Sequence, residues 1–68
     1  MEIEITVNGK KRMVGQGLSI SNLLSSFNIV QTHVVVEINE CAIDRDKYNS
    51  TTLNSGDTVE ILQFVGGG

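Results

Sequence analysis

The 68-residue sequence predicts an α+β protein with a mixed sheet of four to five strands and one main helix packed on one face. Three observations predict this class. The chain begins with alternating polar and apolar residues, continues with a helical apolar stripe, and ends with two runs rich in β-branched and apolar residues. A two-layer α+β sandwich is one of few ways to bury such faces in a chain of this size.

The first element is a hairpin. Residues 2–7 alternate polar and apolar side chains, which is typical of a half-buried strand. Asn8 and Gly9 follow, and both tolerate the positive φ that a two-residue hairpin turn requires. Residues 10–14 then return as a second, more polar strand. We expect the two strands to pair antiparallel.

A helix of about ten residues is the second element, with residue spacing that follows the helical repeat. Its apolar stripe, at i, i+3, i+4 and i+7, consists of Ile20, Leu23, Leu24 and Phe27. Ser19 is the expected N-cap, because its hydroxyl can accept a hydrogen bond from a first-turn amide. Asn28 is expected to end the helix.

The middle of the chain predicts a central strand followed by a short one. Residues 33–39 are rich in β-branched side chains, and a short strand is expected around 41–43. The charged segment 44–47 is expected to be a solvated loop, with Tyr48 and Leu53 buried beneath it.

A turn and a final strand close the sheet. Residues 54–57 form the turn, in which Gly56 supplies the left-handed backbone, and residues 58–65 form the strand. Leu62 and Phe64 fall on the strand face opposite its other apolar residues. They predict an apolar docking patch for a partner; the alternative is a strand buried on both faces.

Composition excludes several classes of function. A net charge of −3 and only three aromatic residues argue against nucleic acid as a partner. No apolar stretch approaches the length that spans a bilayer, and the acidic N-terminus does not resemble a signal peptide. We therefore expect no membrane partner, a monomer when free, and a location in the cytoplasm, with a plastid stroma as the alternative.

The residues also predict no bound cofactor and no metal site. Cys41 and His33, the only residues of their types, fall short of the four ligands of a structural zinc site. We interpret Cys41 as a packing or surface thiol and His33 as a structural or solvated side chain. No catalytic motif is present, which predicts a carrier or binding protein and not an enzyme.

The chain ends in three glycines. They predict a flexible glycine tail over residues 66–68, which follows a domain over residues 1–65 whose order of elements predicts a β-grasp fold. Because glycine lacks a Cβ, Gly66 and Gly67 can thread a channel too narrow for other residues. The competing interpretation is a frayed terminus or the remnant of a linker.

The order of elements is that of a β-grasp fold, and several short motifs add a family resemblance. Asn8-Gly9, Gly56-Asp57, Val59-Glu60-Ile61 and the ending Phe64-Val65-Gly66-Gly67-Gly68 resemble the ThiS family of sulfur carriers, which has a ubiquitin-like fold. The resemblance covers the whole chain. The MoaD family and ubiquitin share the fold and a terminal diglycine, so a MoaD-like carrier for molybdopterin or a ubiquitin-like protein modifier remains as an alternative.

The resemblance implies a function in thiamin biosynthesis. A ThiF-like, E1-like partner would use ATP to adenylate the C-terminal carboxylate of Gly68, and a sulfur donor would convert the adenylate to a thiocarboxylate. The sulfur would then pass to a ThiG-like thiazole synthase. Gly66, Gly67, Leu62 and Phe64 are the expected partner-binding residues.

Overall fold

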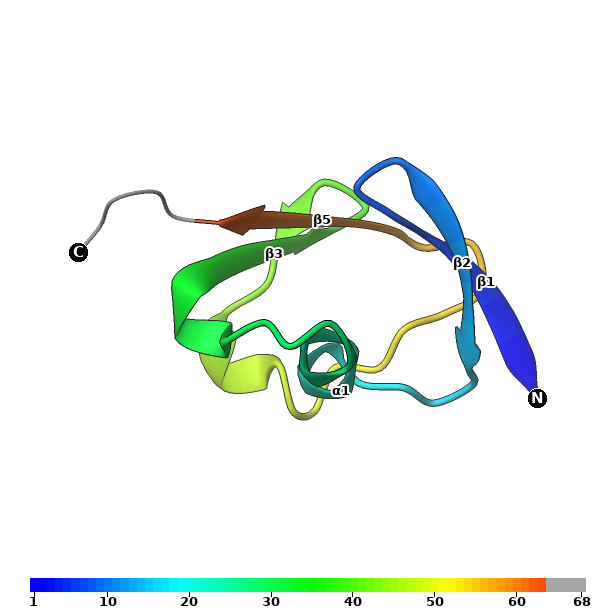
Figure 1. Ribbon diagram of the computed structural model, residues 1–68, viewed down its shortest axis with the longest axis horizontal. Coiled ribbons are helices and arrows are strands. Elements are labelled where there is room, and N and C mark those ends of the chain that lie inside the picture. The colour runs from blue at the N-terminus through cyan, green and yellow to red at the C-terminus, as the bar shows by residue number, and fades with distance from the viewer. Residues whose placement is uncertain (64–68) are drawn as a thin grey trace.

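A five-stranded mixed sheet curves around one side of a short helix in the computed structural model, which describes residues 1–63 (Figure 1). The strand order is β2-β1-β5-β3-β4. The predicted α+β class is confirmed. In chain order the elements are β1 (Glu2–Val7), β2 (Lys10–Gly15), α1 (Ile20–Ser26), the 3-10 helix η1 (Gln31–His33), β3 (Val34–Ile38), β4 (Cys41–Ala42), the 3-10 helix η2 (Arg45–Lys47) and β5 (Thr58–Gln63).

The predicted hairpin joins β1 and β2. The strands are antiparallel, and Val7 pairs with Lys10 across a two-residue turn. Asn8 and Gly9 have φ angles of 48° and 84°, the left-handed conformation that such a turn demands. Asn and Gly adopt it at little cost, which explains why the local sequence predicted the turn correctly.

The middle of the sheet belongs to β5. It lies parallel to β1, with Val7 opposite Val59, and antiparallel to β3, with Val34 opposite Gln63. The prediction that residues 33–39 form the central strand therefore needs correction: β3 is an inner strand between β5 and β4. Both runs are apolar enough for an inner position, and only the long-range pairing decides which one lies in the middle.

The helix is shorter than predicted, with seven residues instead of about ten. Ser19 is the N-cap as predicted, and its hydroxyl accepts from the Asn22 amide at 3.1 Å. At the other end the amides of Asn28 and Ile29 donate to Ser25 and Leu24 carbonyls, the pattern of a Schellman motif. Asn28 takes the left-handed position with φ 59° directly after the C-cap Phe27, which confirms the prediction that Asn28 ends the helix.

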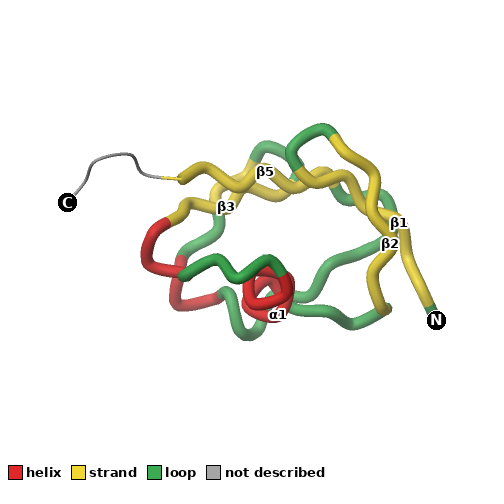
Figure 2. Tube along the Cα trace, in the orientation of Figure 1, coloured by secondary structure: helices red, strands yellow, loops and turns green. Residues whose placement is uncertain are grey.

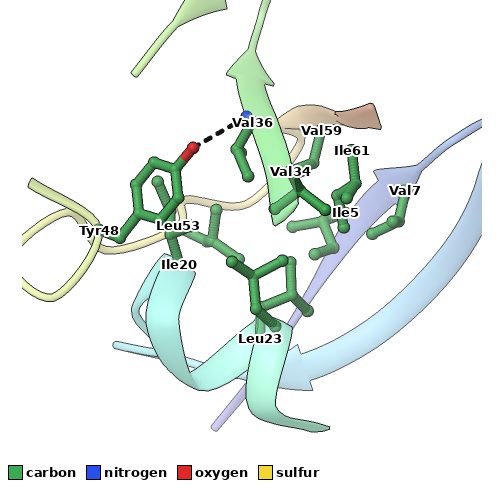
Figure 3. Packing of buried hydrophobic residues seen from close by; sticks show 11 residues of the cluster. Ile5, Val7, Ile20, Leu23, Val34, Val36, Tyr48, Leu53, Val59 and Ile61 are labelled. Carbon is green, nitrogen blue, oxygen red and sulfur yellow. Dashed lines mark hydrogen bonds between the residues drawn. The ribbon is translucent and has the colours of Figure 1, made fainter. Parts of the chain in front are cut away.

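The core fills the space between α1 and the concave face of the sheet (Figure 3). Tyr48 and Leu53 are buried, as predicted, and the Tyr48 hydroxyl accepts a hydrogen bond of 3.0 Å from the Val36 amide. Within residues 1–63, the buried apolar residues lie between positions 5 and 61: Ile5, Val7, Ile20, Leu23, Leu24, Val34, Val36, Tyr48, Leu53, Val59 and Ile61.

The two 3-10 helices, red at the left of Figure 2, pack at the end of the molecule where β3 begins. The predicted charged loop 44–47 contains η2, and its residues are exposed. Arg45 donates from Nε to the Gln31 carbonyl and from Nη2 to the Val34 carbonyl. These bonds connect η2 to η1 and to the start of β3.

Candidate functional site

Most of the predicted site residues follow β5 in the sequence, from Phe64 to Gly68. On one side of β5, every residue of β3 is paired with it, from Ile38 opposite Val59 to Val34 opposite Gln63. On the other side the main-chain pairing with β1 reaches only Val59. Between Val59 and Gln63 that side of β5 depends on a side chain.

Asn8 supplies the missing partner. Its Oδ1 accepts from the Ile61 amide at 2.7 Å, and its Nδ2 donates to the Ile61 carbonyl at 3.3 Å. Its own amide donates to the Val59 carbonyl at 2.9 Å. The Asn8 side chain therefore replaces one main-chain residue beside β5 and holds the strand two residues beyond the last β1 pair. The Asn-Gly pair predicted the turn, but nothing local in the sequence indicates this second contact.

Leu62 faces away from the helix. Val59 and Ile61 are buried, whereas Leu62 is 47% exposed beside its half-buried β3 partner, Val35. The prediction that Leu62 lies opposite Val59 and Ile61 is confirmed, and the alternative of a strand buried on both faces does not hold at Leu62. A role of Leu62 in partner binding stays a prediction.

A buried carboxylate fixes the opposite end of β5. Asp57, only 8% exposed, accepts from the Asn54 amide at 2.8 Å and from Asn39 Nδ2 at 3.0 Å. Asn39 Oδ1 in turn accepts from the Thr58 amide at 2.9 Å. Gly56 has the predicted left-handed φ of 87°. The Gly-Asp turn thus connects β5 to the turn that follows β3.

Cys41 and His33 do not come together. His33 precedes the start of β3, and Cys41 pairs with Ile38 at its end. The strand between them spans roughly 13 Å at about 3.3 Å per residue. Cys41 also lies level with Val59, at the end of β5 far from Gln63. This separation agrees with the interpretation of Cys41 as a surface thiol and not as a sulfur relay.

Residues 1–63 contain no cluster of three His, Cys, Asp or Glu side chains arranged to hold a metal ion. Within the same part of the chain, no helix has both the length and the apolar character needed to span a bilayer. The feature that the described residues do show is the exposed end of β5 at Leu62 and Gln63.

Four of the predicted site residues, Phe64, Gly66, Gly67 and Gly68, lie outside the described residues, as does the predicted boundary between residues 65 and 66. The boundary between domain and tail, the tail itself and the reactive carboxylate therefore stay predictions.

The fold and this strand end define a ubiquitin-like β-grasp domain. A crystal structure of a thiamine biosynthesis protein (ThiS) from Geobacter metallireducens superimposes with a TM-score of 0.82 and is 39% identical in sequence. The alignment covers 97% of this chain and 100% of that one. The ThiS family model matches residues 2–68, and the chain belongs to the ThiS family.

Two further proteins are similar to this chain. The sulfur carrier protein ThiS of Bacillus subtilis is 38% identical over 50 residues, which are 74% of this chain and 76% of that protein. A thiazole synthase of Paramagnetospirillum magneticum is 29% identical over 66 residues, 97% of this chain. This chain spans only 20% of the length of that thiazole synthase.

Proposed function

We propose that this chain is a sulfur carrier of thiamin biosynthesis, and that the carboxylate of Gly68 carries the sulfur as a thiocarboxylate. The observation that carries the proposal is the match to the ThiS family model, which extends through the final glycines. The exposed end of β5 supports it, because only two residues of the sequence separate Gln63 from those glycines.

Carboxylate chemistry explains why a partner is needed. An α-carboxyl group is an anion at neutral pH, which makes it a nucleophile toward the α-phosphate of ATP but a poor acyl electrophile. A ThiF-like enzyme would form the acyl-adenylate of Gly68 and release pyrophosphate. A persulfide then displaces AMP to give an acyl disulfide, and a thiol reduces the S–S bond, which leaves the thiocarboxylate and a new disulfide.

The relatives favour thiazole formation as the reaction that uses the carried sulfur. A protein that contains a stretch similar to this chain is itself named a thiazole synthase. A ThiG-like thiazole synthase would therefore receive the sulfur, in preference to molybdopterin synthase or to a lysine of a modified protein.

Intact-mass spectrometry tests the proposal. The chain is incubated with ATP, the ThiF-like enzyme of the same organism, a persulfide donor and a thiol. We expect a mass gain equal to one sulfur minus one oxygen, and transfer of that sulfur when a thiazole synthase is added. An isopeptide bond to a lysine would instead identify a protein modifier, and sulfur transfer only to molybdopterin synthase would identify a MoaD-like carrier.

Gly67→Ala sharpens this test. If Gly66 and Gly67 thread a narrow channel of the activating enzyme, an added Cβ at position 67 should block adenylate formation. Ser55→Ala, in the distant turn before β5, is the matched control and should be adenylated normally. Normal adenylation of Gly67→Ala would contradict the narrow-channel argument.

A further inference from the structure

An open groove of about 440 Å³ lies on the helix side of the sheet, next to the end of β5. We call it the hairpin groove, and its lining includes Val7, Lys10, Arg12, Phe27, Ile29 and Gln63. The register explains how both cations face it: Lys10 lies opposite the core residue Val7, and Arg12 lies opposite Ile5. Directly opposed residues of an antiparallel pair share one face of the sheet.

The hairpin groove is basic on an acidic protein. Two of the chain's five Lys and Arg residues line it, without any Asp or Glu, although the whole chain has a net charge of −3. The other cations with contacts in residues 1–63 are engaged elsewhere: Lys11 lies 4.0 Å from Glu4, and Arg45 binds main-chain carbonyls. Lys10 and Arg12 have no ion pair within that range.

Arg12 is held in place by an aromatic ring. Its guanidinium carbon lies 4.9 Å from the centre of the Phe27 ring, within the range of a cation–π interaction. This contact leaves the N–H groups of the guanidinium available to a ligand. An aromatic ring does not form the two parallel N–H···O hydrogen bonds that a carboxylate forms with arginine. The groove therefore combines a pre-positioned cation, a second cation on Lys10 and apolar side chains from β1 and the segment after α1.

We propose that the hairpin groove binds an acidic peptide segment of the adenylating partner, with an apolar side chain against Val7 and Phe27 and carboxylates paired to Lys10 and Arg12. This inference rests on the proposed function. The groove borders Gln63, so an enzyme that takes up the following residues must approach this end of the sheet. Charge complementarity then attracts an acidic segment to a basic groove on a protein that is otherwise acidic.

The same two cations have a competing explanation. Inward-pointing charges on an edge strand such as β2 prevent edge-to-edge association of sheets. That explanation predicts no effect of Lys10 or Arg12 on adenylation.

The test compares two double variants with the same change in net charge. Lys10→Glu/Arg12→Glu reverses the groove charges, whereas Lys11→Glu/Lys47→Glu reverses two exposed lysines outside the groove. The measurement is ATP–pyrophosphate exchange by the ThiF-like enzyme of the same organism, at varied carrier concentration. We expect the groove variant to raise the KM for the carrier about tenfold with kcat within about twofold, and the control to stay within about twofold.

Salt dependence provides a second readout. The KM of the wild-type chain should rise with ionic strength, and the groove variant should lose most of that dependence. If Lys10→Glu/Arg12→Glu fails to fold, Lys10→Gln/Arg12→Gln is used instead, and about a threefold rise in KM is expected because attraction is removed without repulsion.

The outcomes separate the two proposals. Equal KM values for the groove and control variants, with wild-type exchange present, would overturn the groove inference and leave the carrier function standing. Absence of exchange with the wild-type chain would overturn the carrier function, and the groove inference would fall with it.

Discussion

The two ends of β5 are built differently. At its start, Asp57 is buried and binds Asn39 and Asn54, and the Thr58 amide donates to Asn39. At its other end Leu62 is 47% exposed, and the Asn8 side chain provides the last contact on the β1 side. A single strand thus has one end enclosed by polar contacts and one end presented to solvent.

This difference teaches that the contacts that stabilise β5 lie at one end, whereas the predicted partner-binding residue Leu62 lies at the other. The enclosed end and the core packed against β5 order the strand, whereas the open end contributes little burial and remains accessible. Regions with few buried contacts are commonly those that proteins use for binding, because ordering or moving them costs little. Variants at the two ends should therefore affect different measurements.

The largest effect is expected from removal of Gly67 and Gly68. The deletion should abolish adenylation and thiocarboxylate formation, because the proposed reactive carboxylate is lost. The melting temperature should stay within a few degrees, because the buried apolar residues of the described chain all lie between positions 5 and 61. Calorimetry together with pyrophosphate exchange measures both; a clear loss of folding would contradict the separation.

Asp57→Ala tests the enclosed end and should lower the free energy of unfolding by about 2 kcal/mol, since it leaves the Asn54 amide and Asn39 Nδ2 without their acceptor. Urea unfolding measures the change. Asp46→Ala, an exposed carboxylate in η2, is the control and should change it by less than about 0.5 kcal/mol. Well below the melting temperature, adenylation of Asp57→Ala should match the wild type.

Leu62→Ser tests the open end. It should raise the KM for adenylation about tenfold, or about 1.4 kcal/mol, if Leu62 contacts the partner at the centre of an apolar interface. Met13→Ser is the matched control, since Met13 is also a large exposed apolar residue, 56% exposed on β2. Equal KM values for the two variants would show that Leu62 is not part of the docking surface.

Asn8→Gly should have the smallest effect. Glycine keeps the left-handed backbone of the turn but removes both side-chain bonds to Ile61, at a cost of about 1 kcal/mol. Hydrogen exchange of the Ile61 amide should become faster, while exchange at Val36 in the core follows the global stability. Asn8→Asp keeps an acceptor for that amide and should retain more of its protection; faster exchange in both variants alike would contradict the role of Oδ1.

Local patterns predicted much of this molecule correctly. The Asn8-Gly9 turn, the Ser19 cap, the left-handed Gly56 and the outward position of Leu62 follow from residue type or from side-chain alternation. The length of α1 did not follow, because the apolar stripe continues to Phe27 although the Schellman motif at Asn28 ends the helix at Ser26. A stripe reports which side chains face the core, not where the backbone stops being helical.

By itself, the sequence determined the α+β class, the hairpin, the capped helix, the burial of Tyr48 and Leu53 and the family resemblance, because each depends on local patterns or on their order along the chain. Tertiary structure alone decided that β5 occupies the middle of the sheet, that Asn8 holds Ile61 from 53 positions away, and that Lys10 and Arg12 border one groove with Phe27. Those arrangements depend on which distant segments pair and in what register. Many core contacts together stabilise this pairing over its alternatives, so no short stretch of sequence reveals it.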